Sequence, residues 1–434
     1  MISEIIEMIR NKQFQKARQA LLLINIVDLA EALDDIEQAD LVKLFRMLPK
    51  DNAADVFAYL SRESQKRIID SINDKELAGI MAELFLDDAV DMIEEMPANV
   101  VKRLLAASDR QTRLLINQFL QYPENSAGSI MTIEFVELRK TITVKDAFKH
   151  IRQTGLDKET IYTCYIIDDQ RRLEGVISIR TLLLADPALR IENIMNTSFI
   201  SARTHDDQET VAYLFDHYDL LTMPVVDNEK RLVGIITVDD ALDIIQEENT
   251  EDFVKMAAVL PYEESYLDTR VIVHARQRLP WLLFLMVSAI FTGLIITYFE
   301  DALAVMPALV AFIPMLMDTG GNCGSQSATL VIRGLALKEI TPGDIMRVIW
   351  KELRVALIVG AMLTVINTIQ IAIFNQSMIL ALTVGISLYL TVIIAKLTGS
   401  LLPIFATRLK MDPAVMASPV ITTLVDAGSL IFYF

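Results

Sequence analysis

A carboxylate with hydroxyl neighbours stands inside the last apolar segment of the chain. This segment, PAVMASPVITTLVDAGSLIFYF, covers residues 413–434 and contains Asp426. A charged side chain at the centre of a membrane helix costs roughly 2.5–3.5 kcal/mol on insertion scales, so its presence needs a reason. Thr422 and Thr423 precede Asp426 by about one turn and lie on the same side of a helix. Either Asp426 pairs with a lysine such as Lys396 or caps a broken helix, or it faces a pore and binds a cation.

Polar, oxygen-bearing side chains also interrupt an earlier apolar segment, PMLMDTGGNCGSQSATLVIRGLAL at residues 314–337. Its proline and glycines predict a break in the helix, and non-helical backbone at membrane depth is tolerated only inside protein or beside a water-filled cavity. Amide, hydroxyl and carbonyl oxygens are ligands of hard cations. Close helix packing alone would explain the glycines but not the polar residues. The sequence therefore predicts a pore lined by residues of both segments: Gly321, Asn322, Gly324, Gln326, Thr422 and Thr423.

Acidic residues gather on two predicted helices outside the apolar segments. In VDDALDIIQEENTEDFVKMAA, residues 238–258, Asp240, Asp243, Glu247 and Glu251 form one row at a spacing of three or four residues, and Asp239, Glu248 and Asp252 form a second row. Like charges at this spacing repel each other and destabilise a helix. A solvated surface is the ordinary explanation, but a divalent cation that neutralises the rows would act as a switch. A shorter acidic group lies in LDDAVDMIEEM at residues 86–96.

The composition divides the chain into two parts. Of its 434 residues 53% are hydrophobic, and long apolar runs begin only at Pro280. Residues 1–269 carry 29 Lys and Arg against 49 Asp and Glu, whereas residues 270–434 carry 11 against 8. The acidity of the first part disfavours nucleic acid and anionic lipid as its partners and favours cations. Two distant cysteines imply no disulfide framework. Because the chain has no HExxH or CxxC motif and no nucleophile–base constellation, we do not expect an enzyme.

Five apolar segments are each near the ~20 residues that a helix needs to cross a bilayer. Basic residues precede the first segment and occupy two of the loops, and the other two loops have none. Because basic loops stay in the cytoplasm, we expect a cell-membrane protein with a cytoplasmic N-terminus and an outside C-terminus. The predicted spans are residues 280–299, 302–332, 348–374, 378–402 and 414–434.

The first part divides again into a helical and an α/β region. Residues 1–127 have helical periodicity, and MLPKDNAADVFAYL resembles EMPANVVKRLL 48 residues further on, which is typical of a short α-solenoid. Residues 128–248 contain a duplication in which IMT and GVISIR recur as IMN and GIITVD. The pair resembles a tandem CBS module. The TVDD stretch resembles the Thr-x-x-Asp with which some CBS pairs hold adenosine ribose, which implies ATP at Thr237 and Asp240.

The whole chain resembles the MgtE family of magnesium channels. The resemblance is carried by PM…GGNxGSQSATxxxRGLA, by TTLVDAG, and by the order of helical domain, CBS pair, acidic helix and five spans. It implies a multidomain membrane protein that forms a homodimer around one pore. The implied domains are a helical regulatory domain at 1–127, CBS domains at 128–190 and 191–247, a connecting (plug) helix at 248–270, and a five-helix transmembrane pore domain at 271–434.

The same resemblance implies Mg²⁺ uptake that is gated by cytosolic Mg²⁺. Asp426 would be the pore site, and high internal Mg²⁺ would bridge the helical domain, the CBS pair and the plug and close the pore. Two alternatives stay open: a broader divalent cation transporter that also carries Mn²⁺ or Co²⁺, and a proton-coupled carrier in which Asp426 titrates. The residues assigned to cytosolic Mg²⁺ by the resemblance are Asp87, Asp91, Asp207, Glu209, Asp219, Asp240, Asp243, Glu248, Glu251 and Asp252.

Overall fold

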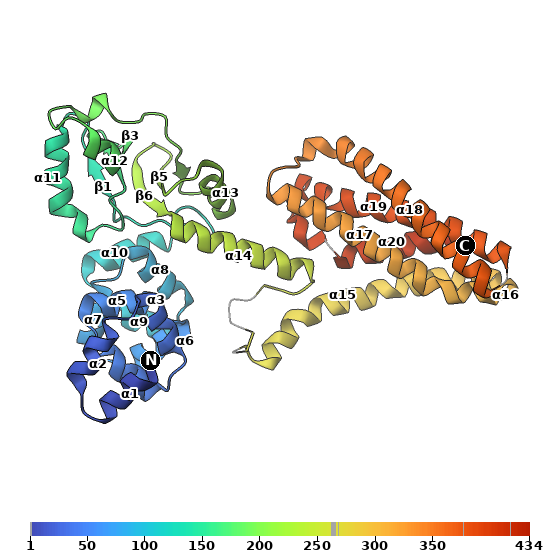
Figure 1. Cartoon of the computed structure of the whole chain (residues 1–434), viewed down its shortest axis with the longest axis horizontal. Coiled ribbons are helices and arrows are strands. Elements are labelled where there is room, and N and C mark those ends of the chain that lie inside the picture. The colour runs from blue at the N-terminus through green and yellow to red at the C-terminus, as the bar shows by residue number, and fades with distance from the viewer. Residues whose placement is uncertain (1, 262–265, 268, 376, 417) are drawn as a thin grey trace. The chain divides into compact units, whose positions relative to one another are not determined.

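The chain forms two compact units, Met1–Ile245 and Gln246–Phe434 (Figure 1). The structure is a computed structural model that describes residues 2–261, 266–267, 269–375, 377–416 and 418–434. The five predicted domains are finer than this division into two units, and their boundaries stay predictions.

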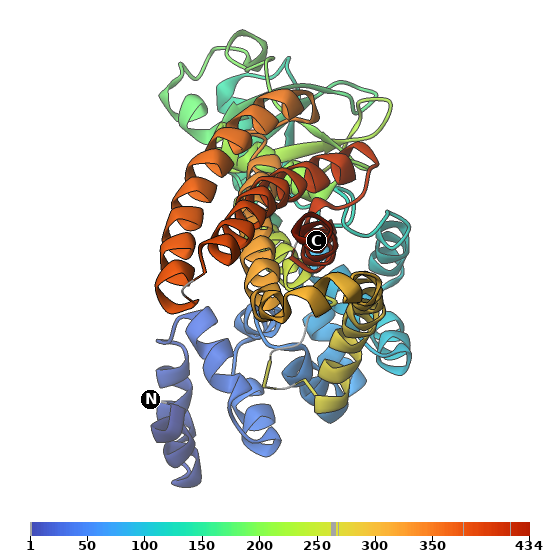
Figure 2. The same cartoon turned by 90° about the vertical axis from the view of Figure 1, so that its right-hand side faces the viewer.

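Short helices, ten among the described residues, form the N-terminal part of the first unit. They pack in two layers because helices contact the next but one, as α3 does α5, α5 does α7 and α7 does α9. Figures 1 and 2 show the N-terminus at one end of this stack. The predicted helical domain is thus confirmed. Its helices are α1 (Ile2–Arg10), α2 (Phe14–Leu21), α3 (Ile26–Asp34), α4 (Gln38–Phe45), α5 (Lys50–Ala58), α6 (Arg62–Ser71), α7 (Asp74–Met81), α8 (Leu86–Glu95), α9 (Ala98–Ala107) and α10 (Arg110–Phe119).

Local sequence signals begin several of these helices. Asn25 and Ser61 each accept a hydrogen bond from a backbone N–H in the first turn of the following helix. Asn73 and Glu76 satisfy each other's backbone N–H groups in a capping box. Apolar side chains on the inner faces, such as the buried Phe57, then hold the two layers together.

A duplicated α/β module follows, in which each copy has one small sheet. Within each sheet the first strand pairs parallel with the second, and the second pairs antiparallel with the third. Thr132 of the first copy bridges to Ile235 of the second, and Asn196 of the second copy bridges to Val176 of the first. The predicted CBS pair therefore folds as two interlocked copies. Its elements are β1 (Val136–Leu138), α11 (Val144–Thr154), η1 (Gly155–Asp157), β2 (Thr163–Ile167), β3 (Leu173–Ser178), α12 (Ile179–Leu184), η2 (Ile191–Asn193), β4 (Ala202–Arg203), α13 (Gln208–Tyr218), β5 (Thr222–Val226), β6 (Leu232–Thr237) and α14 (Val238–Met256).

The glycine that opens GVISIR and GIITVD is required by this interlock. A Cβ atom on Gly175 would stand 3.0 Å from the backbone oxygen of Asn196. A Cβ atom on Gly234 would stand 2.8 Å from the backbone oxygen of Thr132. Glycine therefore lets the crossing segment of the other copy lie directly against the strand.

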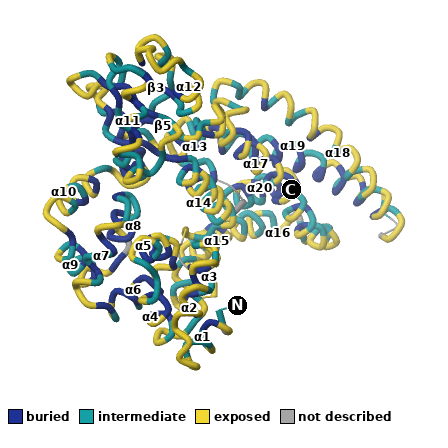
Figure 3. Tube along the Cα trace, turned by 60° about the vertical axis from the view of Figure 1, so that its left-hand side comes forward, coloured by how far each residue is buried: buried dark blue, intermediate teal, exposed yellow. Residues whose placement is uncertain are grey.

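The second unit contains helices and no strand among its described residues. In it α17 (Ile313–Ala336) and α20 (Ser418–Tyr433) pack on each other, and α19 (Met378–Arg408) contacts both. α18 (Ile345–Asn375) packs on α19, and α15 (Val271–Tyr298) packs on α20. Figure 3 shows buried residues along α19, whereas α18 exposes much of its length. The short elements are α16 (Glu300–Val305), η3 (Pro307–Phe312), η4 (Pro342–Asp344) and η5 (Pro413–Met416).

Three helices among the described residues are long and apolar enough to cross a membrane. They cover Val271–Tyr298, Pro342–Phe374 and Met378–Arg408. The helices at the second and fifth predicted spans are α17, which carries a row of polar side chains, and α20, which is apolar but has only 16 residues. The chain thus has the apolar helices of a membrane protein, and the number of helices that cross stays a prediction.

Two predictions about individual helices are wrong. The predicted break in the second span is absent, because α17 runs without interruption through the glycine-rich stretch. A continuous helix keeps its backbone groups hydrogen-bonded, which a membrane demands. The connecting helix, predicted at 248–270, is the end of the longer α14 and stops at Met256. Residues 262–265 and 268 of that prediction lie outside the described residues.

Candidate cation pathway and acidic clusters

The two faces of α17 differ in chemistry. Asp318, Asn322 and Gln326 are exposed in the single chain and follow one another at four-residue spacing, so they form a polar row along the helix. The opposite face is buried, and α17 packs on α19 and α20. Polar and ionised side chains are costly against lipid tails. This row therefore belongs beside water or protein.

Glycines let α17 approach α19 and α20 closely. A Cβ atom on Gly324 would stand 2.6 Å from Ile421 of α20, and one on Gly399 of α19 would collide with the backbone of Gly324. Gly321 packs against Thr422, whose Cγ2 would lie 3.3 Å from such an added Cβ. Small residues allow this approach at membrane-helix contacts. Packing is the physical reason why α17 stays unbroken, and it places Gly321 and Gly324 on the buried side of the helix.

Asp426 of α20 lies within electrostatic range of a second carboxylate on α17, the helix that packs against it. Its side chain is half-buried, and its Oδ1 atom is buried without a hydrogen bond from any described residue. Asp318 of α17 is the charged group that acts on it. Thr423 donates its hydroxyl to the backbone oxygen of Pro419 at 3.1 Å. Two neighbouring carboxylates repel each other unless a cation or a proton lies between them.

Lys396 contacts Ser327 and not Asp426, the partner that the sequence suggested. Its side chain is only 5% exposed and donates to Ser327 Oγ at 3.4 Å. Ser327 in turn donates to Glu352 Oε2 at 2.7 Å. This chain of contacts joins α19, α17 and α18. The structure thus contradicts the pairing of Lys396 with Asp426 and leaves the cation explanation for Asp426.

Carboxylates of the helical domain and of the CBS pair gather in the first unit. Asp87 and Asp88 open α8 and act electrostatically on Glu159 and Asp240. Burial, followed by repulsion from these neighbours, raises the pKa of Asp88 to about 6 and the pKa of Glu159 to about 7. Burial also raises the pKa of Asp87 well above its usual value, and Asp87 Oδ1 has no hydrogen-bond partner among the described residues. We call these four residues the α8 cluster; its oxygen ligands suit a hard divalent cation.

A second acidic group surrounds Lys255 in the second unit. The Lys255 ammonium, near the end of α14, lies 2.6 Å from Glu251 Oε1 and 2.6 Å from Asp412 Oδ2. Asp412 belongs to the connection between α19 and α20. Burial and then the charge of Asp412 raise the pKa of Asp252 to about 6. Three carboxylates thus share one lysine, and we call these four residues the Lys255 cluster.

Other predicted Mg²⁺ residues occupy exposed positions or have local roles. Asp207 caps α13 by accepting from the backbone N–H of Glu209 at 3.0 Å. Asp219 ends α13 in a left-handed conformation with φ 51°. Asp91 and Asp243 are exposed, and the latter's pKa is raised by partial burial and by Asp239. Within the predicted set, Asp240 acts electrostatically on Asp87, and the half-buried Glu248 acts with Glu251 on Asp252.

The predicted nucleotide residues contact each other. Thr237 Oγ1 donates to Asp240 Oδ2 at 2.6 Å at the start of α14. Because Asp240 also belongs to the α8 cluster, a nucleotide and a cation would share this residue. Throughout the part of the chain that the structure describes, no three His, Cys, Asp or Glu side chains stand close enough to hold a metal ion. The carboxylates of either cluster would have to move closer to one another to bind a cation.

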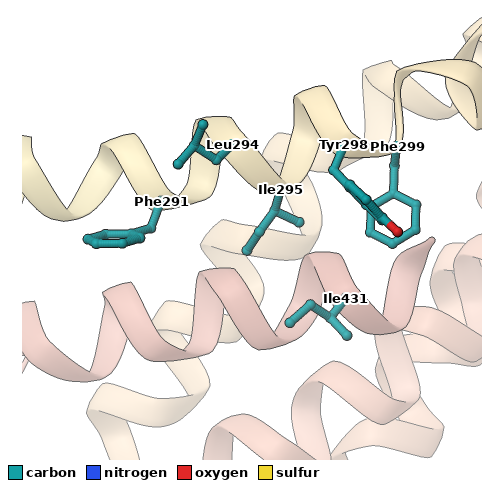
Figure 4. Close-up of a pocket in the computed structure, with 6 residues that line it drawn as sticks. All are labelled: Phe291, Leu294, Ile295, Tyr298, Phe299 and Ile431. Carbon is teal, nitrogen blue, oxygen red and sulfur yellow. The ribbon is translucent and has the colours of Figure 1, made fainter.

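A cavity of about 370 Å³ between α15 and α20 offers no ligand for a cation (Figure 4). Its lining side chains are apolar or aromatic, so it suits hydrocarbon. They are Phe291, Leu294, Ile295, Tyr298, Phe299 and Ile431.

Two curated proteins are similar to almost the whole chain. The magnesium transporter MgtE of Thermus thermophilus is 37% identical over 96% of this chain and 93% of its own length. The magnesium transporter MgtE of Bacillus subtilis is 35% identical over 94% of this chain and 93% of its own. This chain belongs to the MgtE family. Since its MgtE relatives are transporters, transport rather than catalysis is its function.

Family models and solved structures divide this MgtE chain as its fold does. The family described as divalent cation transporter matches residues 313–434, the MgtE intracellular N domain matches 24–125, and the CBS domain matches 127–187 and 191–247. The soluble part of a magnesium transporter is 31% identical with a TM-score of 0.54, covering 57% of this chain and 97% of that one. The cytosolic domain of the Mg²⁺ channel MgtE in complex with ATP is 37% identical with a TM-score of 0.53, covering 56% and 100%.

Five residues of these sites in the MgtE chain received no role from the sequence: Asp88, Glu159, Lys255, Asp318 and Asp412. Asp318 could have been predicted from the sequence, because it precedes Asn322 by four residues within the same polar segment. No sequence pattern points to Glu159 or Asp412, since each lies in a connection between elements without a motif around it. Only the packing of distant segments places them beside other carboxylates.

Proposed function

We propose that this MgtE-family chain carries Mg²⁺ across the cell membrane through a pore formed by α17 and α20. The observation that carries the proposal is the buried Oδ1 atom of Asp426, which has no hydrogen bond from any described residue and lies within electrostatic range of Asp318. Similarity over nearly the full length to magnesium transporters supports Mg²⁺ as the transported ion.

A second copy of the chain completes the pore in this proposal. The polar row of Asp318, Asn322 and Gln326 is exposed in one copy, and lipid tails are an unfavourable neighbour for it. Two facing rows would enclose water instead. Two Asp426 side chains, one per copy, would then offer two negative charges at the axis, which match one Mg²⁺. Mg²⁺ sheds water reluctantly, so few direct ligands suffice.

The acidic clusters fit Mg²⁺ as a regulatory ion. In the α8 cluster Asp87, Asp88, Glu159 and Asp240 would hold it, and in the Lys255 cluster Glu251, Asp252 and Asp412. Two carboxylates ~4–6 Å apart at an effective dielectric near 20 repel by about 3–4 kcal/mol. Since about 5.5 kcal/mol moves a two-state equilibrium from 1:99 to 99:1, a few pairs suffice to switch a gate. Cytosolic Mg²⁺ would neutralise them and close the pore. The remaining assignments, Asp91, Asp207, Glu209, Asp219, Asp243 and Glu248, stay part of this proposal.

ATP is proposed as a second ligand of the CBS pair. The contact of Thr237 with Asp240 supports it, as does the ATP complex of a similar cytosolic domain. ATP would bind through its ribose at these two side chains. Binding can be measured by calorimetry on the purified protein, and Thr237→Val should weaken it.

The transport proposal is tested with the purified protein in vesicles that contain a Mg²⁺ indicator. Asp426→Asn should reduce Mg²⁺ flux by about tenfold or more, because the loss of one charge contact costs on the order of 1–4 kcal/mol. Asp301→Asn is the matched control, since Asp301 is an exposed carboxylate of the same unit on α16. Near-normal flux in both Asp426→Asn and Asp426→Ala would overturn the pore assignment.

A broader divalent specificity is the second candidate, because the matching family is described as a divalent cation transporter. The same vesicles measure it with Mn²⁺ and Co²⁺ in place of Mg²⁺. A flux that follows an imposed pH gradient would instead indicate a proton-coupled carrier. The five-span arrangement with a cytoplasmic N-terminus belongs to the same proposal, and labelling of single cysteines introduced in the loops tests it.

A further inference from the structure

The first ten residues of α18 extend beyond what a membrane span requires. With 31 residues the helix is about 46 Å long, whereas the hydrocarbon core is about 30 Å thick and needs ~20 residues. The polar end at Asn375 marks the far side of the apolar stretch. The excess therefore falls on residues 345–354, which we call the foot of α18. At this position a helix lies among lipid headgroups.

Basic residues and a tryptophan share one face of this foot. Trp350, Lys351 and Arg354 stand three, four and seven residues after Arg347, so the four lie within an arc of about 100°. All four are exposed, and Trp350 is 60% exposed. Tryptophan is enriched at the level of the headgroups. The opposite face carries Glu352, which accepts a hydrogen bond from Ser327 of α17.

Two of these cations have no carboxylate partner among the described residues. Arg347 forms an ion pair with Asp344 at 3.0 Å, so its charge is partly neutralised. Arg354 donates from Nε to the Trp350 backbone oxygen at 3.2 Å, and its guanidinium lies 5.8 Å from the Trp350 ring centroid. Lys351 has neither hydrogen bond nor ion pair in the described chain. The tryptophan thus orients Arg354, and two positive charges remain for an outside anion.

The same face continues as an apolar surface along α18. Ile358, Val365 and Ile369 are exposed one to four turns above Arg354, and Ile358 is 64% exposed. A molecule that lies along this face meets positive charge at the foot and hydrocarbon above it. Only a lipid with an anionic headgroup and acyl chains has this order of chemistry.

We infer that the foot of α18 binds an anionic phospholipid, whose phosphate contacts Lys351 and Arg354 and whose acyl chains lie along the apolar face. The charge of the membrane part supports this partner, since residues 270–434 carry 11 basic against 8 acidic residues. Because Glu352 on the other face holds Ser327, the bound headgroup also stabilises α18 against α17. This inference does not depend on which ion the protein carries.

The test compares lipid retention by native mass spectrometry after extraction from nanodiscs that contain phosphatidylcholine and phosphatidylglycerol. The wild-type protein should retain phosphatidylglycerol in preference to phosphatidylcholine. Lys351→Gln and Arg354→Gln should each reduce this preference by about fivefold, the factor that corresponds to about 1 kcal/mol per basic residue near an anionic surface. Lys410→Gln is the control, because Lys410 is an exposed cation of the loop after α19.

Three outcomes would overturn the inference. The Lys351→Gln/Arg354→Gln variant could retain phosphatidylglycerol as the wild type does. Added inorganic phosphate could displace the lipid completely, which would indicate a free-anion site. The double variant could change the oligomeric state while lipid retention stays unchanged, which would assign this face to a second copy. Thermal unfolding of each variant in phosphatidylcholine alone checks that the protein remains folded, and we expect midpoints equal to the wild type there.

Discussion

Lys255 Nζ lies 2.6 Å from Asp412 Oδ2 and so joins the end of α14 to the connection between α19 and α20. The same ammonium lies 2.6 Å from Glu251 Oε1. Lys255 therefore occupies the place in its cluster that a cation from solution would take. A cation that enters must compete with this tethered positive charge.

Lys255→Met should make the transporter close at lower internal Mg²⁺. Removal of one positive charge at about 4 Å changes the cation's interaction energy by about 1–4 kcal/mol, so the half-inhibiting Mg²⁺ concentration should fall by about fivefold or more. Vesicle flux at graded internal Mg²⁺ measures this. Lys255→Arg keeps the charge and should behave as the wild type. An unchanged inhibition curve in Lys255→Met would exclude a role of this cluster in gating.

The α8 cluster should make the first unit more stable as the pH falls from about 8 to about 5.5. Its carboxyls have raised pKa values, about 6 for Asp88 and about 7 for Glu159, so the folded state binds more protons than the unfolded state in this range. The ionised form is the destabilised one, and stability is lost as the pH rises through these pKa values. Thermal unfolding in the absence of divalent cations measures the slope.

Two controls accompany the pH experiment. Glu159→Gln should raise the unfolding midpoint at about pH 7.5 by on the order of 2–4 °C, which corresponds to about 1 kcal/mol, and should flatten the pH slope. Mg²⁺ should flatten the slope in the wild type because it replaces the protons. A midpoint that rises with pH between 5.5 and 8 would contradict the prediction.

Asp318→Asn should weaken transport less than Asp426→Asn does. Asp318 is exposed and acts on Asp426 at the contact of α17 with α20, so its charge assists the ion without enclosing it. We expect a severalfold rise in the Mg²⁺ concentration at half-maximal flux, since an exposed charge contact at about 4 Å contributes about 1 kcal/mol. Flux curves over external Mg²⁺ measure the shift. An equal loss in both variants would place Asp318 in the ion's direct contact.

The contact chain from Lys396 through Ser327 to Glu352 should show coupling in a double-mutant cycle. Lys396→Met removes a buried ammonium and should destabilise the protein by roughly 1–3 kcal/mol, because Ser327, which donates to Glu352, loses its cationic partner. Adding Glu352→Gln should restore part of this loss. Thermal unfolding in detergent gives the comparison. Strictly additive effects would show that Lys396 and Glu352 act independently.

Local patterns in the sequence were enough to predict which domains and helices this protein contains. The spacing of acidic residues, the repeat of GVISIR as GIITVD, the apolar runs and the polar segment with Asp426 each depend on residues close together in the chain. Periodicity and hydropathy are local properties, so the helical domain, the CBS pair and the membrane helices could be predicted from them. The likeness to MgtE rested on the same local motifs.

Only the tertiary structure decided which of these residues meet. The packing of segments that are far apart in sequence pairs Lys255 with Asp412 and brings Glu159 within electrostatic range of Asp88, and Asp426 within range of Asp318. The glycines of α17 show most directly what local sequence patterns cannot predict. Their local preference predicts a broken helix, but the gain from close contact with α19 and α20 outweighs it, and a continuous helix leaves no backbone group unbonded in the membrane.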